Sequence, residues 1–141
     1  NILEHLYTKG ICLTLGRPAD NLKSLLDEKG IKTENLIFID AITKKINQKG
    51  NLKNCYYVNN PTEIFSAIDS AASSIPGKKF LIFDSLAELY ISQGFKSLLF
   101  LDFLSDRLST HNMQAIFLTK DLQDTEIRKF MEEKCDKVII L

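Results

Sequence analysis

The apolar segment 80–83, with the sequence FLIF, constrains the fold of this chain more than any other, because it ends abruptly at Asp84 and Ser85. Four consecutive apolar residues without polar alternation are typical of a strand buried on both faces, and such strands belong to parallel sheets covered by helices. In these sheets, ligands bind outside the carboxyl ends of the strands. The segment therefore predicts an α/β fold and places Asp84 and Ser85 at its candidate site.

Short apolar segments alternate with amphipathic segments along the rest of the chain. We expect strands over residues 11–15, 36–40, 55–58, 80–84, 114–119 and 137–141. Helices are expected before Gly10, after Pro18, over about 60–75, over about 95–110 and from Asp121 onward. This alternation indicates one three-layer α/β domain with a mostly parallel sheet and helices on both faces.

Two connecting segments and one helix have distinctive compositions. Residues 43–54 carry Lys, Asn, Gln and Gly with little apolar content, so we expect a loop there, and we expect only a short turn between Ser85 and the helix at 95. The sequence Asn60-Pro61-Thr62-Glu63 combines a cap, a proline at the first position and an acid at the third, which is a strong helix start. The helix over 95–110 is apolar nearly all round, which indicates deep burial or a partner.

The composition excludes several partner classes. Lys plus Arg equals Asp plus Glu, 18 each, so no overall field favours nucleic acid or an anionic membrane. A local basic cluster consists of Lys44, Lys45 and Lys49. Because no aromatic residues are interleaved with it, it indicates a solvated loop and not a nucleic-acid site. No apolar run approaches the roughly 20 residues that cross a bilayer. We expect neither a nucleic-acid nor a membrane partner.

The three cysteines bear on the cellular compartment of the protein, and the two ends of the chain bear on whether it is part of a longer polypeptide. Cys12, Cys55 and Cys135 are an odd number at wide spacing with no C-x-x-C pair, so we expect reduced, buried thiols in the cytoplasm rather than zinc or redox chemistry. The chain opens with Asn1 and stops inside the apolar segment 138–141. We expect residues 1–141 to be a single domain from a longer polypeptide, truncated at both ends.

Four stretches, in this order, carry a resemblance: 13–18 (LTLGRP), 36–41 (LIFIDA), 80–86 (FLIFDSL), and 114–119 (QAIFLT) followed by 137–141. They resemble the RecA/KaiC-like P-loop ATPases, especially the small archaeal members implicated in signalling. Each stretch alone is a weak motif, and the order and spacing of the set give it moderate specificity.

The resemblance implies a vestigial nucleotide site. Asp84 corresponds to the Walker B acid, which holds Mg²⁺ only if nucleotide binds, and Ser85, Thr119 and Arg17 would lie around the same site. Simpler interpretations exist for each: Asp84 and Ser85 as turn residues, and Arg17 as a surface residue beside a turn proline. For the segment that contains Thr119, a helix cap at Asp121 needs no ligand. For Asp40, a cap or turn role is favoured over a metal role.

The phosphate-binding part of the family pattern is missing. The motif G-x-x-x-x-G-K-[ST] does not occur, and the segment after the strand 11–15 reads Gly16-Arg17-Pro18, where many relatives place a catalytic Glu. We therefore expect no catalytic residue and no cofactor in the chain as given, with ATP and Mg²⁺ implied only if a P-loop lies upstream. The resemblance puts the P-loop strand between residues 114–119 and 137–141, and an open sheet there would favour a homo-oligomer or a protein partner.

Three functions remain open at this point. The favoured one is a nucleotide-binding-deficient regulatory or assembly module in signalling, and the missing phosphate-binding motif and catalytic Glu argue against enzyme activity. The first alternative is an active ATPase domain whose P-loop precedes residue 1. The second is a receiver-like domain with Asp84 as phosphoacceptor, although Gly16-Arg17 does not provide the acidic pair that a receiver needs after its first strand.

Overall fold

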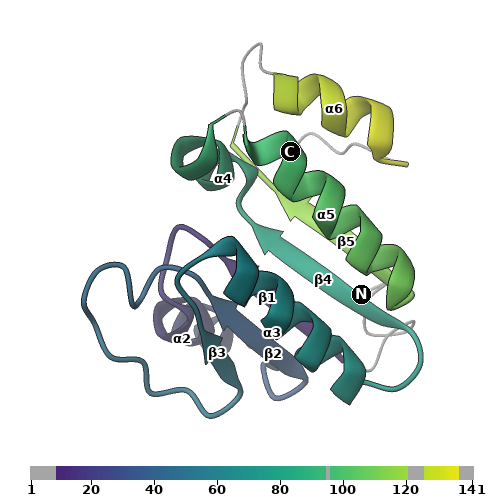
Figure 1. Cartoon of the computed structure of the whole chain (residues 1–141). Coiled ribbons are helices and arrows are strands. Elements are labelled where there is room, and N and C mark those ends of the chain that lie inside the picture. Colours follow the sequence, from purple (N-terminus) through teal and green to yellow (C-terminus); the bar gives the residue numbers. More distant parts are fainter. Residues whose placement is uncertain (1–8, 95, 121–125, 137–141) are drawn as a thin grey trace.

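In the part of the chain that the structure describes, five parallel strands form one sheet in the spatial order β3-β2-β1-β4-β5 (Figure 1). The computed structural model describes residues 9–94, 96–120 and 126–136. The strands are β1 (Gly10–Thr14), β2 (Leu36–Asp40), β3 (Cys55–Tyr57), β4 (Lys79–Asp84) and β5 (Met113–Leu118). All four neighbouring pairs are parallel, which confirms the predicted α/β class.

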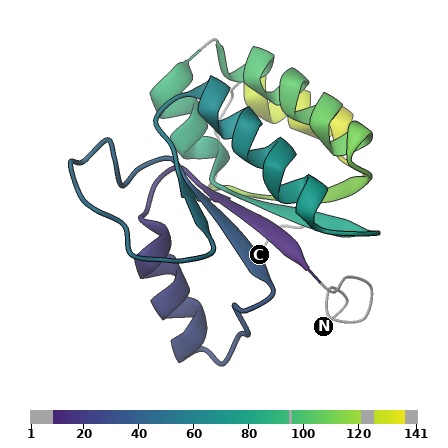
Figure 2. The ribbon, with the colours of Figure 1, turned by 60° about the horizontal axis from the view of Figure 1, so that its bottom comes forward.

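Helices lie on both faces of this sheet, giving three layers (Figure 2). The helices are α2 (Ala19–Glu28), α3 (Pro61–Ser74), α4 (Leu86–Gln93), α5 (Lys96–Thr110) and α6 (Glu126–Lys134). α2 covers one face, on the side of β2, whereas α3, α4 and α5 cover the other. α5 lies between α3 and α6 and contacts both.

β4 is an internal strand, as the FLIF segment predicts. It pairs with β1 on one side and with β5 on the other, and the register puts Asp84 between Thr14 and Leu118. Strands in this position are buried on both faces, which is why the sequence carries an unbroken apolar run here. Asp84 consequently lies at the carboxyl end of the sheet, where a ligand site is expected.

Side chains of the sheet alternate between two apolar cores. The larger core packs Ile11, Leu13, Leu81 and Phe83 against α3, α4 and α5. The smaller core, under α2, joins the alternate sheet residues to α2 and comprises Cys12, Ala19, Leu22, Leu36, Phe38 and Phe80. On the α2 side of β5, Ile116 and Leu118 remain 38% and 47% exposed, because α2 lies over the other half of the sheet.

The start of α3 forms as its sequence predicts. Asn60 is the N-cap, its side-chain oxygen accepts from the Glu63 N–H at 2.9 Å, and Pro61 occupies the first helical position. The Glu63 carboxylate in turn accepts from the Asn59 N–H. These contacts satisfy backbone donors that the first helical turn leaves unpaired.

One helix was not foreseen. The expected short turn after Ser85 is instead α4, so that part of the prediction is wrong. Ser85 caps this helix, and Leu86 and Leu89 bury into the larger core. Gly94 ends it with φ +56°, a backbone conformation that favours glycine, and α5 begins at Lys96. α4 has only eight residues, of which two are buried and apolar. Its helical periodicity in the sequence is therefore too weak to predict a helix directly after a strand.

Most other boundaries agree within one residue. Residues 41–54 contain no helix or strand, as expected, and α5 covers the described part of the predicted helix over 95–110. The predicted helix before Gly10, the helix start at Asp121 and the strand 137–141 lie outside the described residues, at least in part. Within the described residues, no helix combines the length and apolar character needed to cross a membrane.

Candidate functional site

The candidate site lies where the carboxyl ends of β1 and β4 meet. The chain runs from β1 outward to β2 and β3, then crosses back through α3 to β4, on the other side of β1. Adjacent strands whose connections depart in opposite directions leave a crevice at their carboxyl ends, and ligands of open α/β sheets bind in such crevices. The loops after Thr14 and after Asp84 border this position.

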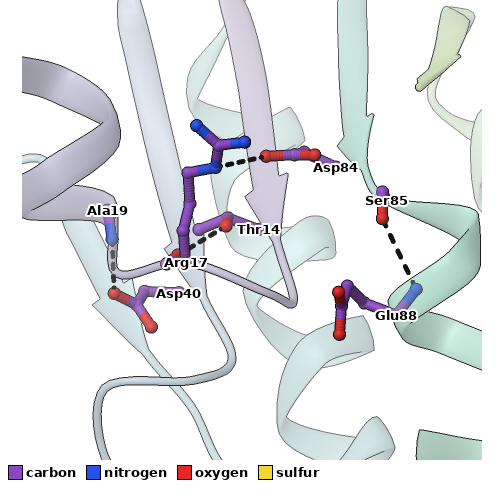
Figure 3. A network of polar contacts seen from close by, with 7 residues as sticks. All are labelled: Thr14, Arg17, Ala19, Asp40, Asp84, Ser85 and Glu88. Atoms are coloured by element: carbon purple, nitrogen blue, oxygen red, sulfur yellow. Dashed lines mark hydrogen bonds and ion pairs between the residues drawn. The ribbon is translucent and has the colours of Figure 1, made fainter. Parts of the chain in front are cut away.

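An ion pair between Arg17 and Asp84 spans this position (Figure 3). Nε of Arg17 lies 3.3 Å from Oδ2 of Asp84, and the Asp84 side chain is 16% exposed whereas that of Arg17 is 49% exposed. The guanidinium therefore covers a carboxylate that is otherwise largely withdrawn from water.

Backbone and hydroxyl contacts fix the turn that carries Arg17. The Leu15 N–H donates to the Asp84 carbonyl at 2.7 Å, which continues the β1–β4 pairing beyond the strand end. The buried Thr14 hydroxyl donates to the Arg17 carbonyl at 2.6 Å. Because the turn is tied to both strands, Arg17 is presented to Asp84 by local structure.

Ser85 and Glu88 border the same turn from the other side. The Ser85 hydroxyl caps α4 by accepting from the Glu88 N–H at 3.4 Å, so the sequence interpretation of Ser85 as a structural residue is supported. The Asp84–Ser85 peptide bond is cis. A Cβ placed on Gly16 would lie 2.6 Å from Cγ of Glu88, so glycine permits this close approach.

Glu88 is the residue that sequence reasoning missed at this site. The acid nearest to Gly16 in the sequence is Asp20, which lies in the first turn of α2 and accepts from the Tyr57 hydroxyl at 2.7 Å. The missed signal is the spacing Ser85-x-x-Glu88, which is typical of a helix start. The spacing was not interpreted as a helix start, because only a short turn was expected after Ser85.

Asp40 has the cap and turn role that the sequence favours. Its fully buried carboxylate accepts from the Ala19 N–H at 2.8 Å, at the start of α2, and from the N–H groups of Ile42 and Thr43. The Thr43 hydroxyl donates to the same carboxylate at 2.6 Å. Four donors thus use the acceptor capacity of Asp40, which supports a structural role over metal binding.

Thr119 does not join the Arg17–Asp84 pair. It follows Leu118, the register partner of Asp84, but its exposed hydroxyl donates to the Lys120 carbonyl at 2.8 Å. Of the four residues assigned to the vestigial site, the structure therefore brings Arg17 and Asp84 into contact and leaves Ser85 and Thr119 in local backbone contacts.

The described residues hold no cluster of three or more His, Cys, Asp or Glu side chains that could bind a metal ion. His111 has an acidic partner outside this site, because its Nε2 lies 2.8 Å from Oδ1 of Asp69. Nζ of Lys79, at the amino end of β4, donates to the His111 carbonyl, so this pair lies at the opposite end of the sheet from Asp84. It cannot act on a ligand bound beside Asp84.

Two cysteines, Cys12 and Cys55, lie near the α2 face. Burial raises the pKa of the Cys12 thiol to about 12, with the Asp84 carboxylate adding to the effect. Burial likewise raises the pKa of Cys55 to about 12. Both thiols are neutral near pH 7, and a neutral thiol is a poor nucleophile and metal ligand.

Comparison with known proteins gives a fold without a named function. No protein-family model matches the chain, and no curated protein matches it. Among solved structures, one that matches is described as an uncharacterized protein, PH0321 from Pyrococcus horikoshii, in complex with an unknown peptide. The match has a TM-score of 0.70 at 10% identity and covers 90% of this chain. It covers 62% of the neighbour's chain, so this protein spans less than two thirds of that length. A likeness at this identity shows the shared fold alone.

Proposed function

We propose that this chain is a RecA/KaiC-like, ATPase-related domain that acts as a cytoplasmic regulatory or assembly module in signalling, without binding nucleotide itself. The observation that carries this proposal is the Arg17–Asp84 ion pair. In the resembled family, the acid at this position holds Mg²⁺. A guanidinium 3.3 Å from that carboxylate supplies the positive charge internally and opposes a second cation there by like-charge repulsion.

The surrounding side chains support the same conclusion. Nucleotide binding through a P-loop requires consecutive backbone N–H groups, a lysine and a hydroxyl. Next to Asp84 lies instead the turn that carries Arg17. The Glu88 side chain, whose carboxylate would repel phosphate, lies beside Gly16 in the same turn. The retained parts of the site are those that hold loops together: Thr14 on the Arg17 carbonyl and Ser85 on the start of α4.

A protein-binding role also agrees with what is known of the structural neighbour. The description of the Pyrococcus horikoshii structure names a bound peptide of unknown identity. A shared fold does not transfer that property, but it shows that a protein of this architecture can hold a peptide. The receiver-like alternative has less support, because receivers follow the strand order 2-1-3-4-5, and the order here is β3-β2-β1-β4-β5.

The test is Mg·ATP binding to the longest natural polypeptide that contains this chain, measured by titration calorimetry. We expect no Mg²⁺-dependent heat of binding, and none for Asp84→Asn either. Arg17→Ala removes the positively charged side chain of the ion pair and is the variant matched to Asp84→Asn. Because the Arg17 side chain is half exposed, this change should alter stability by only about 0–1 kcal/mol.

One outcome would reverse the proposal in favour of an active ATPase. If the natural polypeptide binds Mg·ATP and Asp84→Asn abolishes that binding, then Asp84 is a working Walker B acid. The Arg17–Asp84 pair would then describe only a resting arrangement of the site.

A further inference from the structure

Four of the exposed side chains of α5 occur in a palindromic order. They are Lys96, Leu99, Phe103 and Asp106, and the intervals between them are three, four and three residues. Intervals of three and four place residues on one side of a helix, so the four form a continuous stripe. Leu99 and Phe103 are 56% and 43% exposed at its centre, whereas the opposite side of α5 buries Phe100, Leu101 and Leu104.

The two charges of the stripe have no partner within the part of the chain that the structure describes. Neither the Lys96 nor the Asp106 side chain takes part in an ion pair or a hydrogen bond there. The nearby Arg107 is different, because it lies 3.7 Å from Asp69 and stacks over the Phe65 ring at 5.1 Å. The stripe therefore offers an apolar centre with one free positive charge at its amino end and one free negative charge at its carboxyl end.

This arrangement is self-complementary under two-fold symmetry. An axis that passes perpendicular to α5 at the level of Leu101, the midpoint of the stripe, exchanges Leu99 with Phe103 and Lys96 with Asp106. In a symmetric contact the same patch meets itself, so each residue faces the one that the axis exchanges with it. Two antiparallel copies of α5 would consequently pack Leu99 on Phe103 twice and pair Lys96 with Asp106 twice.

The aromatic centre is already held in position. The Phe103 ring contacts Phe65 of α3 at 5.9 Å in an edge-on geometry. A half-exposed ring fixed from behind loses little freedom when a partner covers it, and such rings are frequent anchors of interfaces. The palindromic order, the unpaired charges and the fixed ring all lie on the same stripe.

We propose that this stripe is the contact surface for a second copy of this chain, bound antiparallel across α5. This inference deepens the proposed assembly role and rests on it. The contact involves one helix from each copy, so it lies at the small end of the range of specific interfaces and gives a weak, concentration-dependent dimer.

The test is the dissociation constant of the dimer, measured by sedimentation equilibrium on the whole chain from about 10 μM to about 1 mM, the range in which weak contacts titrate. Lys96→Glu sets a carboxylate against Asp106 of the second copy, and Asp106→Lys sets two positive charges against each other. Each should weaken the dimer at least tenfold. The double variant Lys96→Glu with Asp106→Lys rebuilds both pairs in reverse and should return within about threefold of the natural chain.

Two controls separate this stripe from other surfaces. Lys29→Glu changes one charge by the same amount on the exposed end of α2 and should leave the dissociation constant unchanged. Leu99→Ser should abolish the dimer, whereas Ile31→Ser, at an exposed apolar residue after α2, should not. Circular dichroism confirms that each variant is folded.

Three results would overturn the proposal: a strict monomer at about 1 mM, a dimer that survives Leu99→Ser, or a charge-swapped double variant no tighter than the single variants. None of these bears on nucleotide. Binding of Mg·ATP would contradict the proposed function while leaving the dimer intact, and loss of the dimer would leave the nucleotide result unchanged.

Discussion

Cys12 shows how a single buried residue links this fold to pH. It lies on β1 under α2, 2% exposed, and burial raises the pKa of its thiol from about 9 to about 12. When the pH rises above 9, the unfolded chain loses this proton but the folded chain keeps it. The free energy of unfolding must therefore fall between pH 9 and 12, and the contribution is fully present below pH 9.

We predict that Cys12→Ala flattens this alkaline loss of stability. Between pH 8 and 10 the natural chain should lose about 1 kcal/mol more than Cys12→Ala, from the titration of one thiol in the unfolded state. Urea unfolding at the two pH values measures the difference. Ile11→Val, at the neighbouring buried position, also shrinks a core side chain but should keep the natural pH dependence. Equal slopes for all three proteins would show that Cys12 is not shielded.

Individual site residues differ in how far the sequence could assign them. Asp40 ends an apolar strand and is followed by loop residues, so local pattern alone favours a cap or turn role, and its four donors agree with this. The partnership of Arg17 with Asp84 could not be read locally, because 67 residues of chain separate them and only the β1–β4 pairing brings them together.

At the scale of elements, capping explains why some helices were foreseen and one was not. α3 has an N-cap at Asn60, a proline at its first position and an acid at its third, and it runs for fourteen residues. α4 has a cap and an acid as well, but only eight residues. A short helix carries little periodicity of its own and forms here because Leu86 and Leu89 bury against the core.

We predict that the two caps contribute unequally to stability. Asn60→Ala should lower the free energy of unfolding by about 1 kcal/mol, because the side chain accepts from Glu63 at 2.9 Å. Ser85→Ala should cost only about 0.5 kcal/mol, because its contact with Glu88 is 3.4 Å long. Chemical denaturation of both variants measures this, with Asn59→Ala as an exposed control. A larger loss for Ser85→Ala would show that Ser85 does more than cap α4.

At the scale of the whole molecule, one core dominates. The side of the sheet that faces α3, α4 and α5 buries the aromatic cluster around Phe83, whose ring lies 5.5 Å from Phe117 and 6.1 Å from Phe100. On the opposite side, the β5 residue Ile116 is more than one third exposed. The two faces of one sheet therefore contribute differently to stability.

We predict that Phe83→Ala destabilises the protein by about 3–5 kcal/mol, as expected when a large core side chain leaves a cavity. Ile116→Ala, on the other face of the neighbouring strand, should cost about 1 kcal/mol or less, because much of its side chain already contacts water. Urea unfolding followed by circular dichroism measures both. Similar losses for the two variants would mean that the β5 side of the α2 face is covered in solution.

The sequence by itself determined the class of this fold, the internal position of the 80–84 strand and the start of α3, because these depend on local periodicity, burial and capping. Only the tertiary structure decided the order of the strands, the contact of Arg17 with Asp84, the place of Glu88 beside Gly16 and the single side of α5 that remains exposed. These depend on which segments distant in the chain become neighbours. That choice is made by the packing of the whole sheet and its helices, which no local pattern contains.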